Sequence, residues 1–318
     1  MSTPAKRVFL ASQGVSMADS VTVSAHAKIN LFLRVLSRES TGFHGIETLL
    51  CLVDLADELT VQRISQGGEV ELDVEGGDTG PAEDNLAVRA ARQMLEATGA
   101  RFGVRIHLKK NIPIRAGLGG GSSDAAATLH AVNALADGAV PRHELLQLAA
   151  KLGSDIPFLA SGAPMALAWN RGERMFRVAA PPPGPTLLAV PPVGISTAEA
   201  YEALRQFQPD PLPRGSVIFD ADAMASWGGI GRLGGNDFEP VVRAKEPRVL
   251  ELFERVAGTG PLLVRMSGSG SAIVAIYRSD ADLANAVSTI GHRDQTLIQT
   301  TTRSSAAPGP VAGEAPNV

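Results

Sequence analysis

A glycine-dense segment, residues 112–127, holds the residues best suited to do chemistry; it reads Ile-Pro-Ile-Arg-Ala-Gly-Leu-Gly-Gly-Gly-Ser-Ser-Asp-Ala-Ala-Ala. Glycines let consecutive backbone N–H groups converge on one point without obstruction by side chains. The alanine-rich part predicts a helix, whose first turn adds unpaired N–H groups and the positive end of the helix dipole. The segment therefore predicts a polyphosphate-binding loop, with an ordinary strand-to-helix turn as the alternative. The residues expected at the phosphates are Pro113, Ile114, Arg115, Ala116, Gly117, Leu118, Gly119, Gly120, Gly121, Ser122 and Ser123.

This loop matches neither of the two common nucleotide-binding motifs. A Walker A loop needs a lysine before its serine or threonine, and Gly121 is followed directly by Ser122. A dinucleotide fingerprint that began at Gly117 would place its last glycine on Ser122. The failed fingerprint argues against a nicotinamide-binding oxidoreductase.

Two polar positions far from this loop are further candidates. Lys28 and Asn30 lie two apart in a predicted strand and share one face, although a lysine there could simply be solvated. A fixed ammonium group near an acceptor hydroxyl would stabilise the charge that develops in phosphoryl transfer. Asp155 follows Gly153-Ser154 and would, in the plainer interpretation, cap the next helix.

Taken together, these segments resemble the GHMP small-molecule kinases, whose phosphate loop reads Pro-x-x-x-Gly-Leu-Gly-Gly-Gly-Ser-Ser-x-Ala-Ala. The resemblance extends in matching order from about residue 22 to 300. It is strongest for the branch of the family that acts on a cytidine-diphosphate-linked polyol. The matching segments are 27–31 (Ala-Lys-Ile-Asn-Leu), 42–44 (Gly-Phe-His), 153–158 (Gly-Ser-Asp-Ile-Pro-Phe) and 236–240 (Asn-Asp-Phe-Glu-Pro).

The resemblance implies an ATP-dependent kinase that phosphorylates a hydroxyl group of this polyol in isoprenoid precursor biosynthesis, with ATP and Mg²⁺ as cofactors. It assigns to Asp155 the orientation or deprotonation of the hydroxyl, and Lys28 would keep that carboxylate ionised. It implies an α+β fold of two domains: an N-terminal domain like ribosomal protein S5 and a ferredoxin-like C-terminal domain, with the site between them. The substrate-binding residues that it implies are Asn30, Phe43, His44, Thr197 and Tyr201.

An aromatic residue beside a histidine, Phe43-His44, indicates recognition of a nucleobase by stacking and hydrogen bonding. The family usually has tyrosine at the first of these positions, so the change to Phe43 keeps the stacking and loses any hydroxyl contact. Tyr201 matches the aromatic on the other side of the cytosine. Segment 266–271 matches a third glycine loop that would close over the phosphates, although alone it predicts only a hairpin turn.

Other interpretations stay open. The chain could be another GHMP kinase, of the homoserine or mevalonate kinase type, although an aromatic–histidine pair suits a nucleobase better than an amino acid. It could also be a ligand-binding member of the fold that has lost turnover, against which Lys28 and Asp155 argue. The metal ligands are unknown: the histidines lack metal-ligand spacing, and Asp124 could help to hold Mg²⁺.

Composition narrows the class of protein. A chain of 318 residues is long enough for two domains, and a net charge of −4 predicts no binding to nucleic acid or to an anionic membrane. It has no apolar run of 18 residues and no signal-peptide pattern, so we expect a soluble cytoplasmic protein. The single cysteine, Cys51, has apolar neighbours and is expected to be a buried thiol. The oligomeric state is not predicted.

The pattern along the chain predicts a flexible extension (1–20), an ATP-binding N-terminal domain (21–180), a C-terminal domain (186–302) and a disordered tail (303–318). A proline-rich linker, 181–185, separates the domains. Alternating apolar residues predict strands at 21–35, 58–64, 69–74 and 102–108 and a strand pair around 262–276, with Gly67-Gly68 turning 58–64 and 69–74 into a hairpin. Helices are predicted from Leu86 to Gly99, capped by Asp84 or Asn85, at 122–136 and at 142–152.

Overall fold

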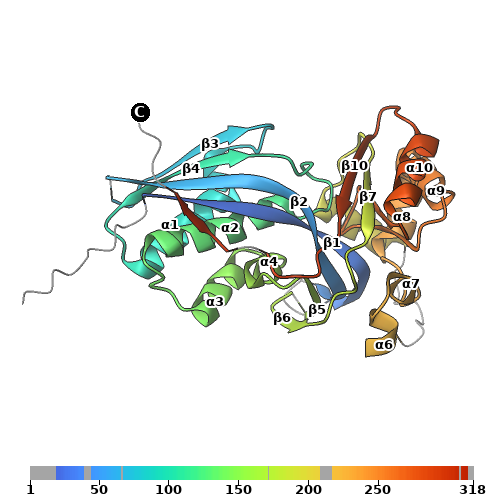
Figure 1. Ribbon diagram of the computed structural model, residues 1–318, viewed down its shortest axis with the longest axis horizontal. Coiled ribbons are helices and arrows are strands. Elements are labelled where there is room, and N and C mark those ends of the chain that lie inside the picture. Colours follow the sequence, from blue (N-terminus) through green and yellow to red (C-terminus); the bar gives the residue numbers. More distant parts are fainter. Residues whose placement is uncertain are drawn as a thin grey trace, which may run out of the picture.

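The computed structural model describes residues 19–38, 44–65, 67–170, 172–207, 217–307 and 309–313. Of the predicted N-terminal extension, residues 1–18 lie outside the described residues, and so does Phe43. The chain forms a seven-stranded sheet with helices packed on one face, beside a four-stranded sheet with its own helices (Figure 1). The expected α+β class is confirmed.

The larger sheet has the strand order β11-β1-β2-β4-β3, and β5 pairs with the first half of β2 and with β6. Its apolar residues alternate along the strands, which places one face of each strand in the core. Its strands are β1 (Ser20–Arg38), β2 (His44–Ile64), β3 (Val70–Glu75), β4 (Gly103–Lys109), β5 (Met165–Asn170), β6 (Arg174–Arg177) and β11 (Val311–Gly313).

The predicted hairpin between β2 and β3 is wrong. The second half of β2 pairs antiparallel with β4, and β3 pairs parallel with β4. Parallel neighbours need a crossover connection, and helix α1 (Leu86–Thr98) supplies it between β3 and β4. Its apolar face packs on the sheet. The Gly67-Gly68 turn exists, but it packs against the chain that leads into β4, where the Gly68 N–H donates to the Phe102 carbonyl at 3.3 Å.

Four helices cover one face of this sheet: α1, α2 (Gly120–Leu135), α3 (Arg142–Leu152) and α4 (Ile156–Ser161) (Figure 1). The predicted caps of α1 are confirmed: the Asn85 side chain accepts from the N–H of Ala87, and Gly99 ends the helix in the left-handed region. Helix α2 begins two residues earlier than predicted, at Gly120. Its alanine-rich surface is buried on most sides between β1 and the other helices.

The smaller sheet has the strand order β10-β7-β9-β8, with every pair antiparallel. This order, with helices between the first and second strands and between the third and fourth, is the ferredoxin-like arrangement that was expected. Its elements are β7 (Pro185–Val190), α5 (Thr197–Phe207), α6 (Ala221–Met224), α7 (Trp227–Gly231), α8 (Phe238–Lys245), α9 (Pro247–Ala257), β8 (Leu263–Met266), β9 (Ile273–Ile276), α10 (Asp280–Ile290) and β10 (Thr296–Thr301).

The expectation of disorder from residue 303 onward is wrong for the described part of the tail. Strand β11 pairs antiparallel with residues 20–22 of β1, and the N–H of Ala307 donates to the Gly162 carbonyl at 3.2 Å. The open edge of β1 offers unpaired backbone groups, and pairing with them needs no large apolar side chain. Position 308 and residues 314–318 lie outside the described residues.

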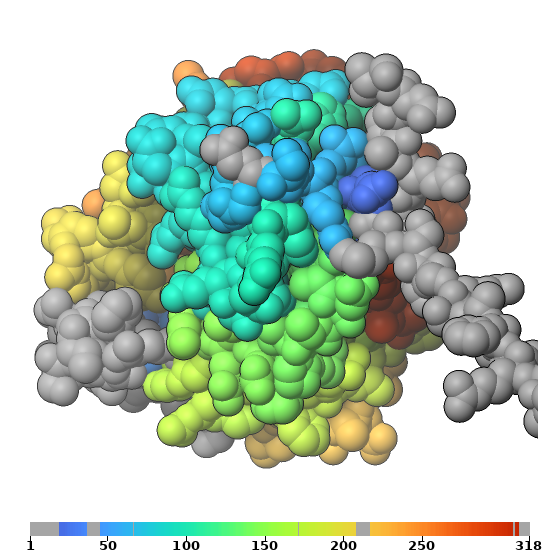
Figure 2. All heavy atoms as spheres, turned by 90° about the vertical axis from the view of Figure 1, so that its left-hand side faces the viewer, coloured from blue at the N-terminus to red at the C-terminus, as the bar shows by residue number. Residues whose placement is uncertain are grey.

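The two sheets share a hydrophobic core. Ile29 and Leu31 of β1 are fully buried in one cluster with Leu188, Val274 and Ile276 of the smaller sheet. Figure 2 shows the end of the molecule that lies to the left in Figure 1, away from the smaller sheet, where turquoise and green segments, the colours of α1 and α3, fill the middle of the face. In the part of the chain that the structure describes, no helix is long and apolar enough to cross a membrane.

Candidate active site

A cavity of about 1020 Å³ lies where β1, the glycine-dense loop, α5 and the loop before β9 meet. Its walls come from segments that are far apart in the sequence: β1 belongs to the larger sheet, and α5 follows β7, the first strand of the smaller sheet. The sequence-predicted residues that line it are Lys28, Asn30, Arg115, Gly117, Gly119, Ser122, Asp155, Thr197 and Tyr201. Of the remaining loop residues, Ala116 and Leu118 point into the core, and the Ser123 side chain is buried away from the cavity, with its hydroxyl donating to the His26 carbonyl at 2.6 Å. Of His44, only the backbone is described, at the start of β2.

Lys28 is the most constrained charged group of the cavity. Its side chain is 5% exposed, and its Nζ lies 3.2 Å from the Asp155 carboxylate, whose side chain is 30% exposed. The same Nζ donates to the Oδ1 of Asn30 at 2.8 Å, as expected for residues that share a strand face. The Asp155 carboxylate makes no capping hydrogen bond to α4, so the plainer interpretation as a helix cap loses its support. The cation and the carboxylate are thus held together at the cavity wall.

Asn30 is fixed from behind by a chain of hydrogen bonds. Its Nδ2 donates to the Thr48 hydroxyl at 2.8 Å, and that hydroxyl donates to the Phe32 carbonyl at 2.7 Å. These bonds settle which side of the amide faces Lys28, because the nitrogen is used on the Thr48 side. Asn30 therefore presents an oxygen to the Lys28 ammonium group.

The glycine-dense loop lies against this pair. The N–H of Lys28 donates to the Leu118 carbonyl at 3.0 Å, and Gly117 and Gly119 have φ of 80° and 73°. A Cβ on Gly119 would lie 2.8 Å from the Cγ of Lys28, and one on Gly117 would lie 2.1 Å from the Ser267 carbonyl oxygen. Both glycines are therefore required by the backbone conformation and by close protein contacts, in addition to any approach of phosphate.

A second loop, residues 267–270, closes one side of the cavity. The Ser267 hydroxyl donates to the Gly117 carbonyl at 2.9 Å and accepts from the N–H of Asn30 at 3.2 Å. The Nδ2 of Asn236 donates to the carbonyls of Met266 and Gly268, both at 2.7 Å. The 236–240 segment, which the sequence singled out only by resemblance, thus holds this loop in place.

Thr197 and Tyr201 lie on α5, on the side of the cavity formed by the smaller sheet's unit. The Thr197 hydroxyl is 3.3 Å from that of Ser269, and the Tyr201 ring packs edge-on against Phe238 with centroids 5.0 Å apart. Burial raises the pKa of the Tyr201 phenol, and so, to a smaller extent, does the negative charge of Asp155, which lines the same cavity. The phenol is therefore protonated and uncharged.

The electrostatics of the cavity favour anions. Lys28, Arg115 and Arg205 line it with positive charge, and Asp155 is the acidic residue in its lining. Arg205, which sequence reasoning missed, carries no local signal because a lysine or arginine on a helix is usually solvated; its guanidinium also pairs with Glu202. This charge suits a ligand that carries several phosphate groups.

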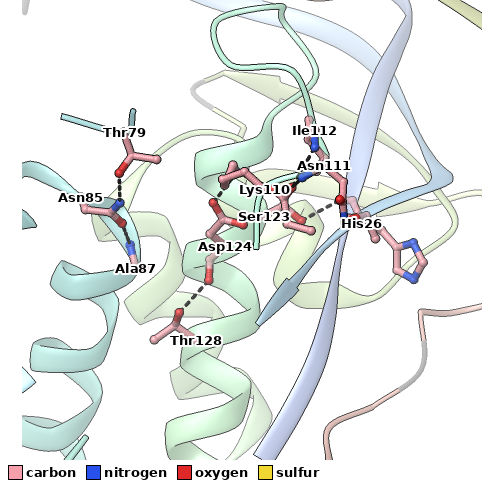
Figure 3. A network of polar contacts seen from close by, with 12 residues as sticks. His26, Thr79, Asn85, Ala87, Lys110, Asn111, Ile112, Ser123, Asp124 and Thr128 are labelled. Carbon is pink, nitrogen blue, oxygen red and sulfur yellow. Dashed lines mark hydrogen bonds and ion pairs between the residues drawn. The ribbon is translucent and has the colours of Figure 1, made fainter. Parts of the chain in front are cut away.

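The protein oxygens in the cavity could hold Mg²⁺ only together with phosphate oxygens of a bound ligand. Among the described residues, no group of three or more His, Cys, Asp or Glu side chains is placed to hold a metal ion. Magnesium in kinases is usually held by one or two protein oxygens together with substrate phosphates, and Ser122 and Asp155 supply such oxygens to the cavity. Asp124, left open as a metal ligand, lies behind the loop and accepts from the Lys110 Nζ at 2.7 Å (Figure 3).

Comparison with known proteins identifies the family. The GHMP kinases N terminal domain matches residues 85–165, and the GHMP kinases C terminal domain matches residues 221–293. A 4-diphosphocytidyl-2-C-methyl-D-erythritol kinase of Pelotomaculum thermopropionicum is 40% identical over 272 residues, which cover 84% of this chain and 91% of that protein. The chain belongs to this kinase family. Its namesake in Brevibacillus brevis is 37% identical, over 82% of this chain and 89% of that protein.

Solved structures agree with this family membership. A crystal structure of 4-(cytidine 5'-diphospho)-2C-methyl-D-erythritol kinase superposes with a TM-score of 0.73 at 36% identity, covering 88% of this chain and 98% of that one. The homoserine kinase of Cytophaga hutchinsonii superposes with a TM-score of 0.66 at 21% identity, covering 96% and 99%. The second match supports the shared GHMP kinase fold alone.

Proposed function

We propose that this chain transfers the γ-phosphoryl group of ATP to the 2-hydroxyl of 4-diphosphocytidyl-2-C-methyl-D-erythritol, a step of the non-mevalonate isoprenoid precursor pathway. The observation that carries the proposal is the Lys28–Asp155 pair, 3.2 Å apart, at the wall of a cationic cavity. Membership of the kinase family supports ATP as the donor and the cytidine-linked polyol as the acceptor.

In this mechanism the substrate oxygen attacks the γ-phosphorus, and the bond from that phosphorus to the bridging oxygen of ADP breaks. Asp155 orients the hydroxyl and accepts its proton. The Lys28 ammonium group stabilises the negative charge on the phosphoryl group as it passes from the bridging oxygen of ADP to the substrate oxygen. Positioning dominates such reactions, so the hydrogen bonds that fix Lys28 through Asn30 contribute directly to rate.

The phosphates of ATP are proposed to lie on the loop 113–123, whose glycines leave the backbone N–H groups and the start of α2 accessible. Mg²⁺, when bound with ATP, would neutralise charge on the transferring phosphoryl group, with Ser122 as its candidate protein ligand. Tyr201, together with Phe43 and His44, is proposed to hold the cytosine base by stacking and hydrogen bonding.

The test is release of ADP from Mg²⁺-ATP in the presence of three separate acceptors: the diphosphocytidyl polyol, homoserine and mevalonate. We expect turnover with the first acceptor alone, and loss of that turnover in Asp155→Asn. Turnover with homoserine or mevalonate instead would make the chain a different GHMP kinase. ATP binding without turnover of any acceptor would favour a non-catalytic member of the fold.

A further inference from the structure

A cluster of three buried charges lies directly behind the phosphate loop, outside the cavity. Asp57 comes from β2, Lys110 follows β4, and Asp124 lies in the first turns of α2. Their side chains are 0%, 4% and 3% exposed, and none of the three lines the cavity. Figure 3 shows the Lys110 side chain between the start of the loop and Asp124 on α2. Charged side chains are seldom buried so completely unless they are paired.

The hydrogen bonds of this cluster tie both ends of the loop to one carboxylate. The Oδ1 of Asp57 accepts from the backbone N–H groups of Asn111 at 2.6 Å and of Ile112 at 2.8 Å, where the loop begins. Its Oδ2 pairs with the Nζ of Lys110, which also donates to the Oδ2 of Asp124 at 2.7 Å, where the loop ends. Asp57 thus holds the start of the loop directly and its end through Lys110.

Stability of the fold alone does not explain why charges are buried here. Two carboxylates face one ammonium group, and replacing buried ion pairs with apolar residues is often neutral or stabilising. What the cluster supplies is a fixed geometry for a segment that would otherwise be loose. Between the two ends, Gly117 and Gly119 adopt positive φ, and Arg115 does so at 57°. A Cβ on Gly120 would lie 3.3 Å from the Lys110 Nζ, so the ammonium group presses against the first turn of α2.

We propose that Asp57 is a positioning residue for nucleotide binding: through Lys110 and Asp124 it sets the spacing between the two ends of the phosphate loop and so pre-forms the backbone cradle for ATP. This inference rests on the proposed function of the loop as the ATP site. It assigns Asp57 no contact with substrate or nucleotide. A loop that is already ordered loses less conformational entropy when ATP binds, so the effect falls on ATP affinity.

The test compares Asp57→Asn with the wild-type chain, because asparagine keeps the size of the side chain and removes the charge that pairs with Lys110. We expect the dissociation constant for ATP, measured by calorimetry, to rise about tenfold, in line with loss of a charge-assisted hydrogen bond. The KM for ATP should rise in parallel, while kcat and the KM for the polyol change by less than about twofold. Val88→Ala, in the core of α1, is the matched control for lower stability alone: its melting temperature should fall while both KM values stay unchanged.

A second variant keeps the test decisive if Asp57→Asn does not fold. Asp57→Asn, Lys110→Met and Asp124→Asn combined make the cluster neutral, which should restore folding and leave the ATP affinity about tenfold weak. Wild-type ATP affinity in either folded variant overturns the inference, and so does an equal rise in both KM values. If the wild-type chain itself binds no ATP, the proposed function fails before any variant is compared, and this inference fails with it.

Discussion

Asp155→Asn tests the proposed catalytic pair most directly, because the substitution keeps the shape of the side chain and removes its charge. Lys28 would then keep the Asn30 Oδ1 at 2.8 Å as a partner and lose the carboxylate at 3.2 Å. Exposed ion pairs contribute up to ~1 kcal/mol and breaking fully buried ones costs ~3–5 kcal/mol. Asp155 is 30% exposed and Lys28 only 5%, so we expect the unfolding free energy to fall by about 1–2 kcal/mol.

The effect on turnover should be far larger than the effect on stability. A positioned acid–base group typically contributes ~10²–10⁴ to kcat, which corresponds to ~3–5 kcal/mol of activation free energy. The KM values should change less, because the contacts of Asp155 strengthen mainly in the transition state. The assay is coupled ADP release at saturating ATP and polyol, with the melting temperature measured on the same samples.

Lys28→Met and the double variant complete the experiment. Since the two residues touch and are proposed to act as a unit, the double variant should be little slower than either single variant. Strictly multiplicative losses in kcat would show independent roles and contradict the pair mechanism. Turnover near that of the wild type in Asp155→Asn would refute the reasoning outright and return Asp155 to a structural role.

Three further outcomes are expected. Gly119→Ala should lower both stability and activity, because the glycine has a φ of 73° and the new Cβ would lie 2.8 Å from the Cγ of Lys28. Gly121→Ala, whose new Cβ would have no contact closer than 3.9 Å, should keep the wild-type melting temperature. It should lose ATP affinity in calorimetry only if phosphate lies at this glycine. Tyr201→Ala should raise the KM for the polyol by a factor that corresponds to ~1–3 kcal/mol of lost stacking, and it should leave the KM for ATP unchanged; an equal rise in both would place the ring elsewhere. Burial raises the pKa of Asp124 from an ordinary 3.8 to about 7, against the opposing effect of its lysine partner. The folded chain therefore binds this proton more tightly than the unfolded chain does. The proton's contribution to the free energy of unfolding is complete below pH 4 and is lost as the pH rises through 7. Between pH 5 and pH 8, urea unfolding should show the wild type losing more stability, or gaining less, than Asp124→Asn, because the buried His26 and His130, whose pKa values burial lowers, titrate alike in both chains.

The parts of the site that the sequence predicts are those with a local signal. The density of glycines before an alanine-rich segment marks the loop, and the two-residue spacing of Lys28 and Asn30 places them on one strand face. The caps of α1 follow in the same way from residues next to the helix, Asn85 and Gly99. Each of these signals depends on neighbours in the chain, which is why sequence patterns capture them.

The parts that the sequence does not predict depend on contacts across the fold. Asp57 is a charged residue inside a strand, which ordinarily indicates a solvated position, and its partner Lys110 lies 53 residues away. The Gly67-Gly68 turn predicts a reversal of the chain but does not determine which strand becomes the neighbour of β2. Strand β11 forms because β1 leaves an edge open, a property of the assembled sheet.

The core shared by the two sheets makes either half of the enzyme unsuitable for expression on its own. Because Ile29 and Leu31 are buried against Val274 and Ile276, either half expressed alone would expose a large apolar surface to water. A linker of 181–185 would therefore be a poor place to divide the gene, even though its prolines make it the most obvious boundary in the sequence. Because residues of both sheets are buried in this core, it also fixes how the two walls of the cavity lie relative to each other.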